Sequence, residues 1–145
     1  MHFQRVLADS HQAFLQLAEH TFAALTGQPV APTGVPTIHF GVGTGAILGE
    51  LAAAGGDVIG ADWRIPIDDA WDRIGRDRAV QGNLDPTLLL GPSRRMLDHA
   101  EDILARVAQR PGHIFNLGHG ILPSTPVEHV QMLAQYVHSA SRRLR

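Results

Sequence analysis

The chain has 145 residues, 44% of them hydrophobic, and its 12 basic and 14 acidic residues give a formal net charge of −2. That size and apolar content suit one domain, and the balanced charge offers no broad attraction to nucleic acid or to an acidic membrane. Cysteine is absent, which excludes disulfides, thiolate metal sites and cysteine nucleophiles.

The N-terminal residues lead into a polar amphipathic stretch and not into an apolar signal core. No apolar run approaches the roughly 18 residues that a membrane-spanning helix needs. We therefore expect a cytoplasmic protein without a membrane segment, whose partner is a small molecule or another protein.

A long amphipathic helix is predicted at the start of the chain. Apolar residues recur at helical spacing from Phe3 to Leu25, and the pattern ends at Thr26 and Gly27. Residues 28–34 are rich in proline and glycine and indicate a connecting loop that is too short to separate two cores.

Short β-like runs then alternate with helical segments. The strands are predicted at residues 35–40, 57–61, 78–81 and 113–117, and the helices between them at 46–54, 67–74 and 92–108. This order is typical of a parallel sheet in an α/β fold. A last helix is predicted to run to about Arg142, with Thr125 as its cap, Pro126 at its first position and Glu128 three residues after the cap.

The glycine-rich segment from Gly41 to Ala46 follows a predicted strand and opens a helix, and Asp62 ends the next strand. In a dinucleotide-binding site, loop amides at a helix N-terminus hold pyrophosphate and such an aspartate accepts from a ribose hydroxyl. The alternative is a tight strand-to-helix turn, and a position that is usually a third glycine holds Ala46. A nucleotide-binding α/β module therefore stays open as a second hypothesis.

Two further strand ends carry polar groups. At the first, Gly82 permits a close backbone approach, Asn83 follows it, and Asp85 before Pro86 can cap a helical turn. At the second, Asn116 and Leu117 lead into Gly118, His119 and Gly120.

His119 is the best single candidate for chemistry, because its two glycine neighbours leave the imidazole accessible at the sheet edge. It can donate to a carboxylate or exchange a proton near neutral pH. The alternative is a histidine that only satisfies backbone carbonyls in a turn. Of the nine histidines, His39, His113 and His119 could converge, but no helical pair has four-residue spacing and cysteine is absent, so no metal site is expected.

In this order and spacing, the segments with Asp62 and Trp63, from Gly82 to Pro86, and from Asn116 to Gly120 resemble the C-terminal part of uroporphyrinogen decarboxylase. The resemblance runs from about Pro36 to Arg145. It implies a (β/α)₈ barrel that dimerises and removes four acetate carboxyl groups from a tetrapyrrole in haem biosynthesis. It also implies that the family works without metal or organic cofactor.

The resemblance gives His119 a place in the substrate pocket. Asp62, Asn83 and Asp85 match family motifs and are expected to support that pocket, as are Asn116 and Gly118 beside the histidine. The resemblance assigns no catalytic residue or proton donor within this chain.

The resemblance further predicts that residues 1–145 form a single partial domain, the C-terminal half of the barrel. The family's other substrate-binding residues, including its arginines, are expected upstream of Met1, so the isolated chain should not decarboxylate at a useful rate. Four strands with helices on one face would leave an apolar face and two strand edges uncovered, which favours self-association. A non-catalytic half-barrel that pairs with another chain is the remaining alternative.

Overall fold

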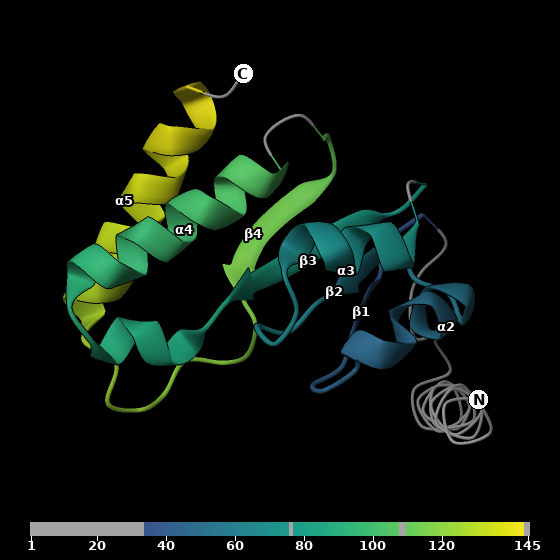
Figure 1. The fold of residues 1–145 in the computed structure, drawn as a ribbon, viewed down its shortest axis with the longest axis horizontal. Coiled ribbons are helices and arrows are strands. Elements are labelled where there is room, and N and C mark those ends of the chain that lie inside the picture. The colour runs from purple at the N-terminus through teal and green to yellow at the C-terminus, as the bar shows by residue number, and fades with distance from the viewer. Residues whose placement is uncertain (1–33, 76, 108–109, 144–145) are drawn as a thin grey trace.

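A computed structural model describes residues 34–75, 77–107 and 110–143, in which strands and helices alternate along the chain (Figure 1). The predicted order of four strands separated by helices is confirmed. The elements are β1 (Ile38–Phe40), η1 (Gly45–Ile47), α2 (Leu48–Ala53), β2 (Val58–Gly60), α3 (Ile67–Ile74), β3 (Ala79–Leu84), η2 (Pro86–Leu90), α4 (Ser93–Val107), β4 (His113–Leu117) and α5 (Val127–Arg143).

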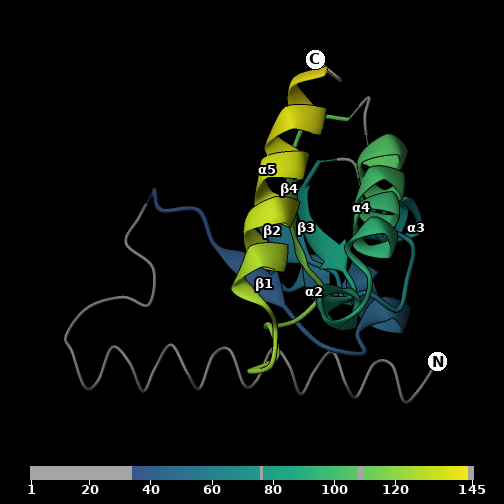
Figure 2. The same ribbon diagram turned by 90° about the vertical axis from the view of Figure 1, so that its left-hand side faces the viewer.

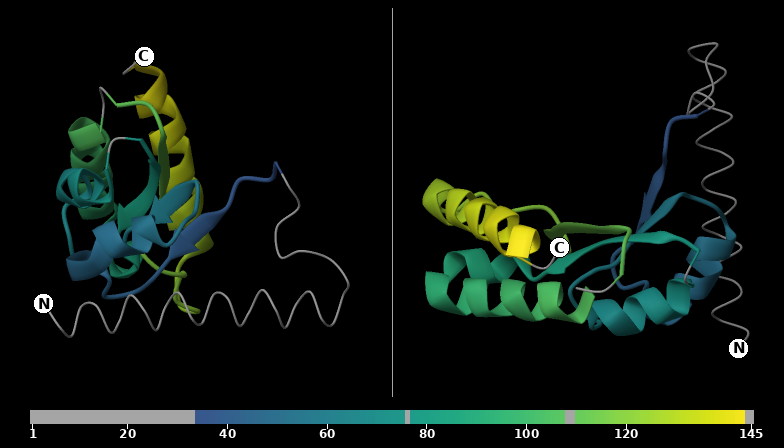
Figure 3. Two further views of the ribbon diagram at one scale, coloured as in Figure 1. Left: turned by 90° about the vertical axis from the view of Figure 1, so that its right-hand side faces the viewer. Right: turned by 90° about the horizontal axis from the view of Figure 1, so that it is seen from above.

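The four strands form one sheet in the order β1-β2-β3-β4, and every neighbouring pair is parallel. Helices α2, α3 and α4 cover one face of this sheet, and α5 lies beside α4 at the β4 edge (Figures 2 and 3). Consecutive parallel strands whose crossover helices share one face make the repeating unit of a (β/α)₈ barrel. The predicted fold class, part of such a barrel, agrees with this arrangement.

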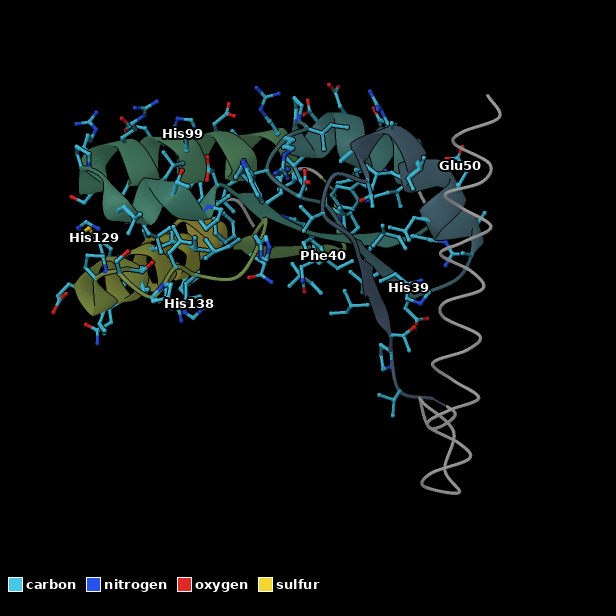
Figure 4. All side chains as sticks on the ribbon, turned by 90° about the horizontal axis from the view of Figure 1, so that it is seen from below. His39, Phe40, Glu50, His99, His129 and His138 are labelled. Carbon is cyan, nitrogen blue, oxygen red and sulfur yellow. The ribbon has the colours of Figure 1, made fainter. Side chains whose placement is uncertain are left out.

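The strand pleat separates a buried face from an open one. Ile59 and Val80 are register partners, are fully buried and belong to the core beneath the helices. Phe40 lies on the opposite face with its register partner Gly60, where a Cβ would come within 2.8 Å of the Phe40 ring (Figure 4). The open face is therefore apolar in this part of the chain.

Most of the large exposed apolar side chains lie on or near the two outer strands of the sheet, β1 and β4. They are Val35, Ile38, Phe40 and Val42 around β1, and Ile114, Ile121, Leu122, Val127, Val130 and Met132 around β4 and α5, with Leu90 in η2. This distribution agrees with the expected uncovered face and edges within the described residues. None of the helices described is long and apolar enough to span a membrane.

The structure differs from the sequence-based expectations at the end of β3 and at the start of α5. Strand β3 continues to Leu84, beyond the predicted end at Gln81, because its pairing with β4 continues through Leu84. Thr125 does not cap α5 with its side chain: its Oγ1 is buried with no hydrogen-bond partner among the described residues, and the helix begins at Val127. The helix predicted at residues 3–25 lies outside the described residues.

Gly82 offers a test of the close packing between β3 and the loop after β2. Its φ is +144°, and a Cβ there would stand 2.7 Å from the carbonyl oxygen of Ala61 on β2's outgoing loop. We expect Gly82→Ala to lower the free energy of unfolding by about 2 kcal/mol or more, from overpacking and backbone strain together. Urea unfolding of the two proteins measures the difference.

Gly91→Ala is the matched control, because the nearest atom to its Cβ, Leu88 O, is at an ordinary 3.7 Å. A Gly82→Ala protein as stable as Gly91→Ala would contradict the claim that β3 needs glycine at this position.

Candidate functional site

The carboxyl ends of the four parallel strands meet at one edge of the sheet, and the polar residues singled out in the sequence follow these ends. Asp62 comes two residues after β2, Asn83 lies at the end of β3, and Gly118 and His119 follow β4. Ligand sites in folds of this kind are built at this edge.

Asp62 is 2% exposed and joins two loops. Its carboxylate accepts the backbone N–H of Gly43, from the loop after β1, and the backbone N–H of Arg64 at 3.0 Å. The Arg64 guanidinium also donates from Nη1 at 2.7 Å. Burial alone would raise the pKa of Asp62, but these hydrogen bonds and the Arg64 charge outweigh it, and the pKa lies below its ordinary value.

These contacts bear directly on the nucleotide-binding hypothesis. The Gly43 amide, which that hypothesis assigns to a phosphate, donates to Asp62 inside the chain. Both Asp62 carboxylate oxygens accept bonds from Gly43 and Arg64. The glycine-rich turn is therefore explained as a tight strand-to-helix turn held by an internal carboxylate.

Asn83 holds the same loop from its backbone side. Its Nδ2 donates to the carbonyl oxygens of Asp62 at 2.9 Å and Ile65 at 2.6 Å, and the side chain is buried. An amide with two donors suits this position, because both carbonyls would otherwise be buried without partners.

Gly118 lets the end of β4 touch this loop. A Cβ at Gly118 would collide with the backbone nitrogen of Trp63 and would stand 3.0 Å from the Asp62 carbonyl carbon. The Gly118 N–H also donates to Leu84 O at 2.8 Å, which ties it to β3. The loop after β2 thus crosses the end of β3 and reaches β4.

His119 is exposed at this edge and lies against two aromatic rings. The imidazole centroid is 6.5 Å from that of Phe40 and 6.2 Å from that of Trp63. Its Nδ1 accepts the Gly120 N–H at 2.6 Å. In the neutral ring the proton therefore sits on Nε2, which makes Nε2–H a donor available to an incoming carboxylate.

Asp85 and Asn116 make mainly local contacts. Asp85 accepts from the N–H and the hydroxyl of Thr87 at 2.8 and 2.7 Å, as the predicted cap of η2. Asn116 is exposed, and its Oδ1 accepts the Leu117 N–H at 2.8 Å. A cavity of about 310 Å³ is lined by Asn83 and Asp85 and by Trp63, but His119 is not among its lining residues.

His39, His113 and His119, which the sequence allowed to converge, do not form a cluster. His113 begins β4, at the end of the strand opposite His119, and its Nε2 donates to Gly82 O at 2.9 Å. Burial lowers the pKa of His113, and this hydrogen bond offsets part of that effect. Of the histidines labelled in Figure 4, His39 lies on β1, His99 on α4, and His129 and His138 nine residues apart on α5. Within the described ranges, no three histidine or acidic side chains could hold a metal ion together.

Phe40, Trp63 and Arg64 belong to this site although their chemistry was not predicted. The guanidinium of Arg64 stacks on the Trp63 ring at 3.9 Å, and both Trp63 and Phe40 contact His119. An aromatic and a cationic residue directly after a strand-end aspartate were visible in the sequence. Their stacking depends on the loop conformation, which spacing alone does not reveal.

Comparisons with known proteins agree with the resemblance seen in the motifs. The family model described as uroporphyrinogen decarboxylase (URO-D) matches residues 9–140. A uroporphyrinogen decarboxylase of Sorangium cellulosum is 56% identical over 110 residues, covering 76% of this chain and 32% of the relative. One of Carboxydothermus hydrogenoformans is 54% identical over 109 residues, 75% of this chain and 31% of the relative.

A uroporphyrinogen decarboxylase of Streptomyces griseus is 44% identical over 136 residues, which cover 94% of this chain and 36% of that protein. The chain therefore spans about a third of the length of the curated relatives it matches. The matched family model, the level of identity and the parallel sheet with its helices agree: this chain belongs to the uroporphyrinogen decarboxylase family.

Proposed function

We propose that this chain supplies part of the active site of an enzyme that decarboxylates uroporphyrinogen III to coproporphyrinogen III in haem biosynthesis. One observation carries the proposal beyond family membership: His119 presents an Nε2–H donor at the carboxyl edge of the sheet, between Phe40 and Trp63. A hydrogen bond from this group would orient a substrate carboxylate. The pyrrole of the substrate serves as the electron sink when carbon dioxide leaves, and no cofactor is invoked.

We assign supporting roles to the other predicted residues. Asp62, Asn83 and Gly118 act on the loop that carries Trp63, and so on the surroundings of His119. Asp85 and Asn116 have local contacts and would shape the ends of β3 and β4. None of these five is proposed to exchange a proton with substrate.

The assembly and location follow as parts of the same proposal. The domain is partial, and the apolar side chains around β1, β4 and α5 would be covered by the rest of a barrel or by self-association. The complete enzyme is proposed to be a cytoplasmic homodimer that acts on a tetrapyrrole and not on nucleic acid.

The first experiment compares the 145-residue chain with a chimera in which it replaces the matching 136-residue segment of the Streptomyces griseus relative. Both are given enzymatically generated uroporphyrinogen, and the products are separated by carboxyl count. We expect stepwise loss of carboxyl groups with the chimera and none with the isolated chain, because a substrate with eight carboxylates needs more cationic donors than this edge holds. An inactive chimera that is folded would contradict the proposed function.

In the active chimera, His119→Ala should lower kcat/KM about 100-fold, the order expected when a positioned hydrogen-bonding or proton-transferring imidazole is lost. His138→Ala, which removes an exposed imidazole from α5, is the matched control and should leave the rate unchanged. Equal rates for the two variants would remove His119 from the site.

The role of Asp62 as an internal support predicts a pH dependence of stability. Because the pKa of Asp62 is lowered in the folded chain, its ionised form stabilises the fold above about pH 4, and this contribution is lost as the pH falls through the folded-state pKa. Asp62→Asn should therefore lower the free energy of unfolding by about 1–3 kcal/mol at pH 7. The difference from wild type should shrink toward acid pH.

Urea unfolding between pH 3 and pH 7 measures this effect. Asp98→Asn is the control, since the Asp98 carboxylate pairs with Arg94 on the exposed face of α4, where water screens the pair and it contributes little to stability. A pH-independent difference between Asp62→Asn and wild type would mean that the Asp62 charge does not hold the loop.

A further inference from the structure

Arg64 is a cation whose position is set on two sides. Its Nη1 donates to the Asp62 carboxylate at 2.7 Å, and its guanidinium carbon stands 3.9 Å from the centroid of the Trp63 ring. Its own backbone N–H donates to the same carboxylate at 3.0 Å. A long side chain anchored at its base and at its tip has already lost most of its rotamer freedom, so a ligand would not have to order it.

The contact with Asp62 fixes the guanidinium but leaves other N–H donors of Arg64 exposed. The Arg64 side chain is 51% exposed, whereas the Asp62 carboxylate beneath it is buried. A guanidinium has five N–H donors in a planar fork, and the bond to Asp62 uses Nη1. The exposed donors match the geometry of a second carboxylate, which a planar fork can bind with two parallel hydrogen bonds.

Arg64 and His119 are arranged around one indole. The Trp63 ring contacts the guanidinium and also lies 6.2 Å from the imidazole centroid. A counter-ion role toward Asp62 explains the salt bridge of Arg64, but it does not explain why the charge is stacked on the ring that His119 contacts. A ligand bearing carboxylates on neighbouring arms could reach both groups at once.

We propose that Arg64 is a carboxylate-binding residue, held in place by Asp62 and Trp63, that engages a second carboxylate of the ligand whose first carboxylate meets His119. This proposal rests on the proposed function for the identity of that ligand, a tetrapyrrole polycarboxylate. The carboxylate site itself depends only on Arg64, Asp62 and Trp63.

Trp63 makes the site observable in the 145-residue chain. The other tryptophan, Trp71, is 1% exposed in the core, with its Nε1 donating to Arg78 O at 2.9 Å. A carboxylate that binds Arg64 should therefore change the emission of Trp63 and leave that of Trp71 unchanged. Mellitate, a benzene ring with six carboxylates and no pyrrole, is the first probe, and Trp63→Phe should abolish the response.

The variants separate a specific site from general charge. Arg64→Ala should raise the Kd for mellitate about tenfold, the order of one charge-assisted hydrogen-bonded pair. Arg94→Ala removes the same charge from an exposed position on α4 and should leave the Kd unchanged. Arg64→Gln keeps a polar, uncharged side chain with the same Cβ, Cγ and Cδ atoms, guards against misfolding and should bind as weakly as Arg64→Ala. Arg64→Lys should recover only part of the affinity, because it restores the charge without the planar fork.

Two results would overturn the proposal: no Trp63 response to mellitate in the wild-type chain, or equal affinities for wild type, Arg64→Ala and Arg64→Gln. Uroporphyrin III, titrated by its own fluorescence, tests the ligand separately. If mellitate binds through Arg64 and uroporphyrin does not bind, the carboxylate site stands and the tetrapyrrole assignment fails. If both bind and both are weakened by Arg64→Ala, the two proposals are supported together.

Discussion

The carboxyl edge of this sheet depends on one buried charge, the carboxylate of Asp62. A carboxylate removed from water is costly unless hydrogen bonds replace its hydration. Here the replacements come from the Gly43 amide, the Arg64 amide and the Arg64 guanidinium, so the loops after β1 and β2 must adopt conformations that satisfy it together. That shared conformation places the Trp63 ring against His119. Asp62 thus sets the surroundings of the His119 imidazole, although it is not one of the rings that contact it.

Packing at two glycines makes this arrangement possible. The loop after β2 has to pass the end of β3 to reach β4, because β3 lies between β2 and β4 in the sheet. Gly82 admits the Ala61 carbonyl and Gly118 admits the Trp63 backbone, so the crossing takes place at near-contact distance. Asn83 then binds two carbonyls of the crossing loop.

Sequence reasoning predicted element boundaries well where proline or glycine stands at the end of an element. It did not predict the contacts that loops make when they fold back onto the sheet. Helix α3 begins after Pro66 and ends before Gly75, and its predicted bounds match the structure. Strand β3 was predicted too short, since its pairing with β4 continues to Leu84, but the close backbone approach predicted at Gly82 is present and is made by the Ala61 carbonyl. Asp62 was correctly placed beside a glycine-rich turn, but spacing reports proximity only. Spacing does not distinguish an aspartate that accepts a hydrogen bond from a ribose hydroxyl from one that accepts a hydrogen bond from the backbone N–H of the turn itself.

The exposure of the open face of the sheet affects how strongly His119 and Arg64 can interact with a carboxylate. His119 and Arg64 are both exposed within the described chain, and water screens a charge-assisted hydrogen bond there. The apolar side chains around β1 and around β4 with α5 mark surfaces whose burial would remove water from the same rim. In the proposed enzyme, covering them would lower the dielectric constant around the two donors, which strengthens each interaction with a carboxylate. The proposed completion of the fold and the proposed ligand binding would therefore be coupled, because both depend on covering the same apolar surface.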